Sequence, residues 1–89
     1  MIMEPSDMFL LQKSAGKAGE TLGLIAWSDD AKLLSIWSQL SVLLGSDPVL
    51  MRHWVHTPNN HLEGKIPANL IVKEDGVDTI LSLLLSYNH

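Results

Sequence analysis

Four residues that constrain the backbone lie close together in the second half of this 89-residue chain. Pro58 and Pro67 fix their own φ angles, and Gly64 and Gly76 permit positive φ values that other residues avoid. Large apolar residues accompany them throughout residues 54–87, whereas a flexible linker is rich in charge and poor in such residues. The stretch therefore predicts a compact connector of defined shape that leads into a last, strongly apolar helix.

Apolar residues recur at helical spacing along the chain, and capping residues or helix breakers separate the repeats. Gly23 and Gly45 are expected to end two of these helices, Pro48 to begin a third, and Asp75 to cap the last. No strand pattern competes, because the apolar run at residues 70–72 is too short for a sheet. The sequence predicts an all-α fold, a small bundle of four to five helices, over residues 8–22, 29–44, 48–56, 67–72 and from 75 onward.

Two apolar stripes define the expected packing. The first helix carries a narrow seam of Leu11, Ala15, Ala18 and Leu22, and its small residues Gly16 and Gly19 leave room for another helix to approach closely. The second helix carries a wider stripe, which is expected to join the last helix in one core. The predicted members of that core are Trp37, Leu40, Trp54, Leu70, Ile80 and Leu84.

The composition predicts an association partner. A chain of this size buries only about 60–65% of the surface that its unfolded form exposes, so its stability is marginal without further help. The chain contains no cysteine, which excludes disulfides and is compatible with a reducing compartment. Its hydrophobic content is 46% and its charged content only 18%, which favours a buried interface. We expect a homo-oligomer, most simply a dimer, formed through the last helix or through the seam of the first.

The charge pattern argues against two classes of partner. The net charge is −4 and the chain has no basic run, so it lacks the electrostatic footprint of a nucleic-acid-binding protein. Its apolar runs are only a few residues long, far short of the ~20 residues that span a membrane. The first residues have no basic region typical of a signal peptide. We therefore expect a single cytoplasmic domain over residues 1–89, without autonomous nucleic-acid binding.

The sequence offers weak candidates for chemistry. His53, His56 and His61, with Glu63 as the nearest acid, are the residues to consider for zinc. No H-E-x-x-H motif or cysteine pair accompanies them, so we interpret them as solvated imidazoles near a helix C-terminus. No serine lies in a nucleophile motif, and the glycines do not form a phosphate-binding loop. We expect no metal, no cofactor and no catalytic residue, and hence no enzyme.

An ordered set of residues in the second half of the chain carries a family resemblance. Over residues 31–87 the chain resembles the C-terminal toxin-binding domain of MbcA/ParS/Xre-type bacterial antitoxins. In this interpretation residues 1–27 supply an N-terminal helix and a crossover, and residues 28–89 supply the antitoxin-like region. The residues that carry the resemblance are Trp54, Pro58, Asn59, Leu62, Gly64, Pro67, Leu70, Glu74, Gly76, Ile80, Leu83 and Leu84.

The resemblance implies a non-catalytic protein-interaction module. Members of this kind are type II antitoxins that pair with a toxin, commonly of the RES fold, which attacks NAD. The antitoxin domain covers the toxin and neutralises it. Carried over to this sequence, the partner-binding residues would lie in the turn and in the last helix, and they are Asn59, Leu62, Gly64, Lys65, Pro67 and Tyr87.

The chain departs from the family in two places. Many members carry a helix-turn-helix before the toxin-binding part, but residues 15–24 lead directly into the helix at 29–44 and leave no room for a recognition helix. Little chain follows Tyr87, whereas a C-terminal tail in the family can occlude the toxin's active-site entrance. The alternative interpretation is a small homo-oligomeric adaptor domain with no toxin partner.

Overall fold

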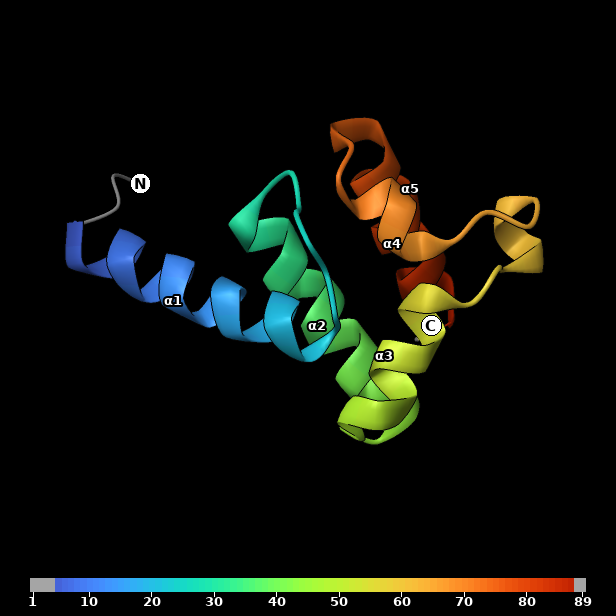
Figure 1. Ribbon diagram of the computed structural model, residues 1–89, viewed down its shortest axis with the longest axis horizontal. Coiled ribbons are helices and arrows are strands. Elements are labelled where there is room, and N and C mark those ends of the chain that lie inside the picture. Colours follow the sequence, from blue (N-terminus) through green and yellow to red (C-terminus); the bar gives the residue numbers. More distant parts are fainter. Residues whose placement is uncertain (1–4, 88–89) are drawn as a thin grey trace.

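The computed structural model describes residues 5–87, with side chains from Phe9 onward. Within this range the chain forms five α-helices and one short 3-10 helix and contains no strand, which confirms the all-α prediction. Helix α1 projects to one side in Figure 1, while α2 to α5 gather together. In chain order the elements are α1 (Pro5–Thr21), α2 (Asp30–Leu44), α3 (Pro48–His56), the 3-10 helix η1 (Asn60–Leu62), α4 (Pro67–Ile71) and α5 (Glu74–Tyr87).

Capping side chains set the starts of α2 and α3. The Asp29 carboxylate accepts a hydrogen bond from the backbone N–H of Lys32 at 3.0 Å, which satisfies one of the free donors at the start of α2. The Asp47 carboxylate accepts one from the backbone N–H of Val49 at 2.9 Å and caps α3 in the same way. Both helices begin within one residue of their predicted positions, because the capping residues are local signals.

Helix α1 begins earlier than the sequence pattern predicted. It starts at Pro5 instead of Met8, so Ser6 and Asp7 lie in its first turn and do not precede it. Proline suits the first helical position, because its fixed φ matches a helix and its missing N–H would have no partner there. The expected start at residue 8 was three residues too late for this reason.

A Schellman motif ends α1, and a histidine from α3 completes it. Gly23 has a φ of 70°, and the N–H of Leu24 donates to the carbonyl of Gly19 at 2.8 Å. The last turn of α1 has no basic residue of its own. Instead, Nε2 of His56 donates a hydrogen bond to the carbonyl of Leu22 at 2.9 Å. The C-terminal end of α1 is thereby fixed to α3, 34 residues further along the chain.

The seam of α1 packs against α2. Ala15, Ala18 and Leu22 are buried, and α1 makes its main helix contacts with α2. Three of the four seam residues are thus buried. The glycines expected to admit another helix do not do so, because a Cβ on Gly19 would meet the Trp27 ring and one on Gly16 would meet nothing within 4 Å. The seam is therefore covered within the chain. Of the two surfaces expected for self-association, the exposed part of the last helix remains.

The crossover at residues 22–29 is held at two points. The backbone N–H of Ser28 donates to the carbonyl of Ile71 at the end of α4, at 3.2 Å. The Trp27 ring lies so close to Gly19 that an added Cβ there would be 2.3 Å from it. Its Nε1–H donates to the Asp30 carboxylate at 2.7 Å, so the indole is partly buried with its polar atom satisfied.

Helix α5 forms the centre of the core, because it packs against both α2 and α4. Two packing partners explain why its apolar arc is wider than one contact requires, with Val77 buried as well as the predicted positions. The predicted core is confirmed for its three aliphatic members on α2 and α5, whereas both tryptophans and Leu70 are only partly buried and pack against it from outside. The fully buried three are Leu40, Ile80 and Leu84.

The junction between α4 and α5 is tighter than the sequence indicated. Helix α5 begins at Glu74, so Asp75 is not its cap and Gly76 lies inside the first turn. The φ of Gly76 is not positive, unlike that of Gly64. A Cβ on Gly76 would lie 2.3 Å from the carbonyl oxygen of Leu70. Gly76 is therefore required for close approach of two backbones, and the expectation that it permits a positive φ was wrong.

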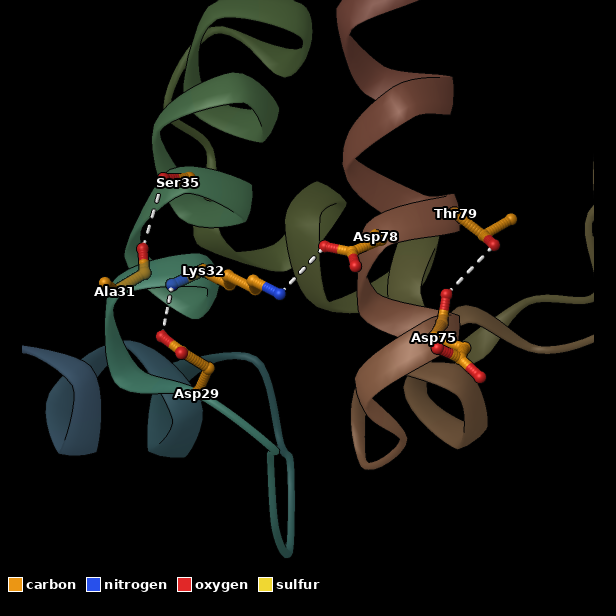
Figure 2. A network of polar contacts seen from close by, with 7 residues as sticks. All are labelled: Asp29, Ala31, Lys32, Ser35, Asp75, Asp78 and Thr79. Atoms are coloured by element: carbon orange, nitrogen blue, oxygen red, sulfur yellow. Dashed lines mark hydrogen bonds and ion pairs between the residues drawn. The ribbon is translucent and has the colours of Figure 1, made fainter.

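An ion pair joins the outer edges of α2 and α5 (Figure 2). Nζ of Lys32 lies 3.0 Å from the Asp78 carboxylate. The hydrogen bond between them raises the pKa of Lys32 above its ordinary value of 10.5, and the nearby charges of Asp78, Asp29 and Glu74 act in the same direction. Both side chains are partly open to solvent, so the pair orients the helices more than it stabilises the fold.

No single helix within residues 5–87 is long and apolar enough to cross a membrane. Helices α2 and α3 reach the required length and composition only as a pair, and the pair is bent by 114°. Their residues Leu33, Leu40 and Met51 are buried in the core.

Candidate partner-binding surface

The turn at residues 59–65 closes on itself through backbone hydrogen bonds. The N–H of Asn59 donates to the carbonyl of Lys65 at 3.1 Å, which joins the two ends in an isolated antiparallel bridge. The carbonyl of Asn59 accepts from the N–H groups of Leu62 and Gly64, both at 2.9 Å. The Asn59 side chain accepts from the N–H of His61 at 2.9 Å and caps η1. Asn59 thus organises the turn from within.

Two consecutive residues with positive φ reverse the chain direction after η1. Glu63 has a φ of 59° and Gly64 a φ of 80°. A left-handed conformation is ordinary for glycine but uncommon for glutamate. The surrounding hydrogen bonds hold Glu63 in this conformation, including one from its own N–H to the carbonyl of Asn60 at 3.2 Å. The result is a turn of fixed shape whose outer residues, Glu63, Gly64 and Lys65, are exposed.

Buried apolar residues fix this turn to the bundle. Leu62 is 6% exposed and belongs to the hydrophobic core. Pro67 opens α4 just beyond the turn and is fully buried. The turn therefore has one apolar anchor within it and one just after it, so its exposed residues are presented from a rigid base.

The end of α5 reaches the same surface through an aromatic contact. The rings of His61 and Tyr87 meet edge to face, with their centroids 5.6 Å apart. This geometry is favourable for aromatic pairs. Both residues are exposed, and the contact brings the last turn of α5 next to the turn at residues 59–65.

A hollow of about 240 Å³ lies between this turn and helices α4 and α5. Its lining combines apolar residues with charged and polar ones from three elements. Thr79 follows Asp78 in α5, and its hydroxyl donates to the carbonyl of Asp75 at 3.1 Å (Figure 2). The lining residues are His61, Leu62, Glu63, Lys65, Leu70 and Thr79.

The six residues implied by the family resemblance divide into two groups. Gly64, Lys65 and Tyr87 are exposed. The other three support the surface: Leu62 and Pro67 are buried, and Asn59 is a partly buried cap. Sequence reasoning did not propose Thr79, because its proximity to the turn depends on how α5 crosses it, and it considered His61 and Glu63 only as possible metal ligands. The six are Asn59, Leu62, Gly64, Lys65, Pro67 and Tyr87.

The histidines do not gather in one place. His56 is bonded to the end of α1, whereas His61 contacts Tyr87. Among residues 5–87, no group of three or more His, Asp or Glu side chains is arranged to hold a metal ion. The surface at residues 59–65 combines a rigid shape, mixed charge and an adjoining hollow.

Comparison with known families gives a match, which includes this surface. The antitoxin Xre/MbcA/ParS C-terminal toxin-binding domain matches residues 39–89, more than half of the chain. The chain belongs to this antitoxin family. The matched region of the antitoxin domain includes the second half of α2 and everything after it, and so contains the whole surface described above; α1 lies outside it. No curated protein and no solved structure matches the chain.

Proposed function

We propose that this chain is a non-catalytic antitoxin module that binds and neutralises a RES-type, NAD-attacking toxin in the bacterial cytoplasm. The observation that carries the proposal is the match to a toxin-binding domain over the region that builds the rigid turn and its hollow. The match to a toxin-binding domain by itself implies a toxin as partner. The RES type follows from the partners common in this family.

The binding surface in this proposal consists of the outer side of the turn and the end of α5. Lys65 and Glu63 lie on it as exposed charges, and Tyr87 lies beside them. Exposed polar residues on a loop held by a rigid scaffold are a common setting for binding. Because the turn is already hydrogen bonded and anchored, little conformational entropy is lost when a partner docks. Leu62, Pro67 and Asn59 act indirectly, by keeping the turn in shape.

Growth rescue provides the test. The product of the reading frame next to this chain's gene is expressed as the toxin, with and without the unmodified chain. Lys65→Glu is then compared with Lys13→Glu, which reverses an exposed charge on α1, outside the matched region. We expect Lys65→Glu to weaken binding by about 1–3 kcal/mol, roughly tenfold to over a hundredfold, and Lys13→Glu to rescue normally.

Circular dichroism confirms that both variants are folded, since a surface charge reversal changes stability by only about 0.5 kcal/mol or less. Asn59 is not a suitable position for this test, because it caps η1 and its replacement would alter the turn itself. Normal rescue by a folded Lys65→Glu would move the binding surface away from this turn. A lack of rescue by the unmodified chain would remove the neutralising role and favour the adaptor interpretation.

Self-association forms a second part of the proposal. The seam of α1 is covered by α2, whereas Leu85 on α5 is 50% exposed and lies two residues from Tyr87. A dimer through the end of α5 would bury this residue. Sedimentation of the wild-type chain and of Leu85→Gln at micromolar concentration tests it: a dimer that is lost in the variant is expected, and a wild-type monomer contradicts the proposal.

A further inference from the structure

We propose that the hollow beside the turn receives one aromatic side chain with a polar tip, a tyrosine or tryptophan, from the toxin. The inference rests on the proposed function, because it specifies how the same surface recognises its partner. The hollow is built by residues from the turn and from two helices, and its members lie far apart in the sequence between His61 and Thr79.

The size of the hollow limits what it can hold. Its volume of about 240 Å³ lies below the roughly 300–1,000 Å³ that is usual for small-molecule and cofactor pockets. A single large side chain from a protein partner is the occupant of suitable scale. Side chains that fill such a pocket near the centre of an interface commonly supply much of its binding energy.

The lining selects the chemistry of that side chain. Leu62 and Leu70 offer apolar surface, whereas Lys65 offers a cation that is favourable over the face of an aromatic ring. The Glu63 carboxylate accepts a hydrogen bond from a phenol O–H or an indole N–H.

Other occupants fit the lining less well. A partner lysine or arginine would be attracted by Glu63 and repelled by Lys65, and an aspartate or glutamate the reverse, so a charged side chain gains little net electrostatic advantage here. An aliphatic side chain would remove water from both charges without offering them a partner, which is unfavourable. An aromatic ring with a polar tip offers its face to Lys65 and its N–H or O–H to Glu63 at the same time.

The walls of the hollow are already fixed before a partner arrives. Leu62 is held in the core, and the Glu63 backbone is held by its hydrogen bond to Asn60. The Tyr87 ring supports that of His61 from the end of α5. The Thr79 hydroxyl is engaged with the carbonyl of Asp75, one turn earlier in α5. A pre-formed hollow of this kind favours a specific anchor, because few side chains must be immobilised on binding.

Filling the hollow from within tests the inference. Thr79→Trp places an indole at its wall, and Ser35→Trp provides a matched control on α2. Both hydroxyls donate to the carbonyl four residues earlier, at 3.1 Å in each case, and both positions are exposed (Figure 2). Ser35 is not among the residues that line the hollow.

The affinity of each variant for the purified product of the neighbouring reading frame is measured by calorimetry. We expect Thr79→Trp to weaken binding by about thirtyfold or more, the level typical of a blocked interface anchor. Ser35→Trp is expected to stay within about threefold of the wild type. Each exposed tyrosine and tryptophan of the toxin is then replaced by alanine. One of these toxin variants should bind the wild-type chain more weakly than the unchanged toxin does. The same toxin variant should bind Thr79→Trp no more weakly than the unchanged toxin does.

The outcomes separate this inference from the function on which it rests. Wild-type affinity of a folded Thr79→Trp overturns the aromatic anchor, while loss of binding in Lys65→Glu would still support the turn as the contact. An anchor identified as an aliphatic or charged residue overturns the predicted chemistry. Absence of binding by the wild-type chain overturns the proposed function and the anchor together.

Discussion

Helix α1 and the turn at residues 59–65 are held in the molecule in opposite ways. The turn has hydrogen bonds between its own residues and buried anchors at Leu62 and Pro67. Helix α1 is fixed mainly at its C-terminal end, by its seam, by His56 and by the Trp27 ring. Toward its other end Phe9 and Leu10 are 64% and 58% exposed, and Figure 1 shows this part projecting from the bundle.

The difference shows where the structure tolerates change. The antitoxin match begins within α2, so it contains the turn and leaves out α1, which packs against α2. The close neighbour of Gly19 in α1 is a side chain that can move, whereas the close neighbour of Gly76 in α5 is the backbone of Leu70. A change of similar size should therefore cost more in the second region.

The largest expected effect follows from Gly76→Ala. The new Cβ would lie 2.3 Å from the Leu70 carbonyl oxygen, so α4 and α5 would have to separate. We expect a loss of about 3 kcal/mol in the free energy of unfolding, at the upper end of overpacking effects, because a backbone atom is the obstacle. Urea denaturation measures it. A variant within about 1 kcal/mol of the wild type would show that this junction is as adaptable as α1.

Asn59→Ala tests whether the turn depends on its internal cap. The substitution removes the hydrogen bond between the Asn59 side chain and the His61 N–H, which should cost about 1 kcal/mol of stability. Asn60→Ala, at the next and more exposed position, is the control and should cost about 0.5 kcal/mol or less. Equal effects of the two substitutions, measured by thermal unfolding, would contradict the role assigned to Asn59.

Gly19→Ala makes the matching test in α1. Its Cβ would also lie 2.3 Å from a neighbour, but that neighbour is the ring of Trp27, which can turn away. The clash and the loss of the Trp27–Asp30 hydrogen bond are offset by the roughly 1 kcal/mol that alanine gains over glycine in a helix, so we expect a net cost of about 1 kcal/mol or less. A change in tryptophan fluorescence should accompany it.

Gly16→Ala is the control for that substitution. Nothing lies within 4 Å of its added Cβ, so it should stabilise the chain by about 0.5–1 kcal/mol through helix propensity alone. Destabilisation by Gly19→Ala as large as that by Gly76→Ala would remove the contrast between the two regions.

The smallest expected effect concerns the Lys32–Asp78 ion pair. The pKa of Lys32 is raised above 10.5 in the folded chain, so the stabilising contribution is fully present below 10.5 and is lost as the pH rises through the higher folded value. The free energy of unfolding of Lys32→Met should therefore be slightly lower than that of the wild type at pH 8. This difference should disappear in strongly alkaline solution. Urea denaturation at the two pH values measures it, and a margin that grew with pH would contradict this assignment.

Local signals in the sequence predicted the helices well. Asp29 and Asp47 mark the starts of two helices, and Gly23 and Gly45 mark the ends of two. Each of these residues acts on its own or adjoining backbone groups, so its effect does not depend on the rest of the fold. The spacing of Pro58, Gly64 and Pro67 likewise predicted a turn of defined shape.

Sequence reasoning was less successful where two segments meet. Gly76 was interpreted as a turn residue, whereas the structure uses it to bring α5 against the Leu70 carbonyl. Leu62 was proposed as a partner contact by resemblance, and its side chain is buried in the core. Trp54 was expected in the centre of that core and is only partly buried. Each of these outcomes depends on distances between helices, which residue spacing along one helix does not specify.

The sequence by itself determined an all-α chain, the bounds of most helices and the family to which the chain belongs. These properties are fixed by neighbouring residues and by an ordered pattern along the chain. Tertiary structure alone decided that the α1 seam is covered, that Asn59 supports the turn from within, and that Thr79 meets Lys65 across a hollow. The physical reason is that packing joins residues distant in sequence, so the surface offered to a partner exists only once α4, α5 and the turn are assembled.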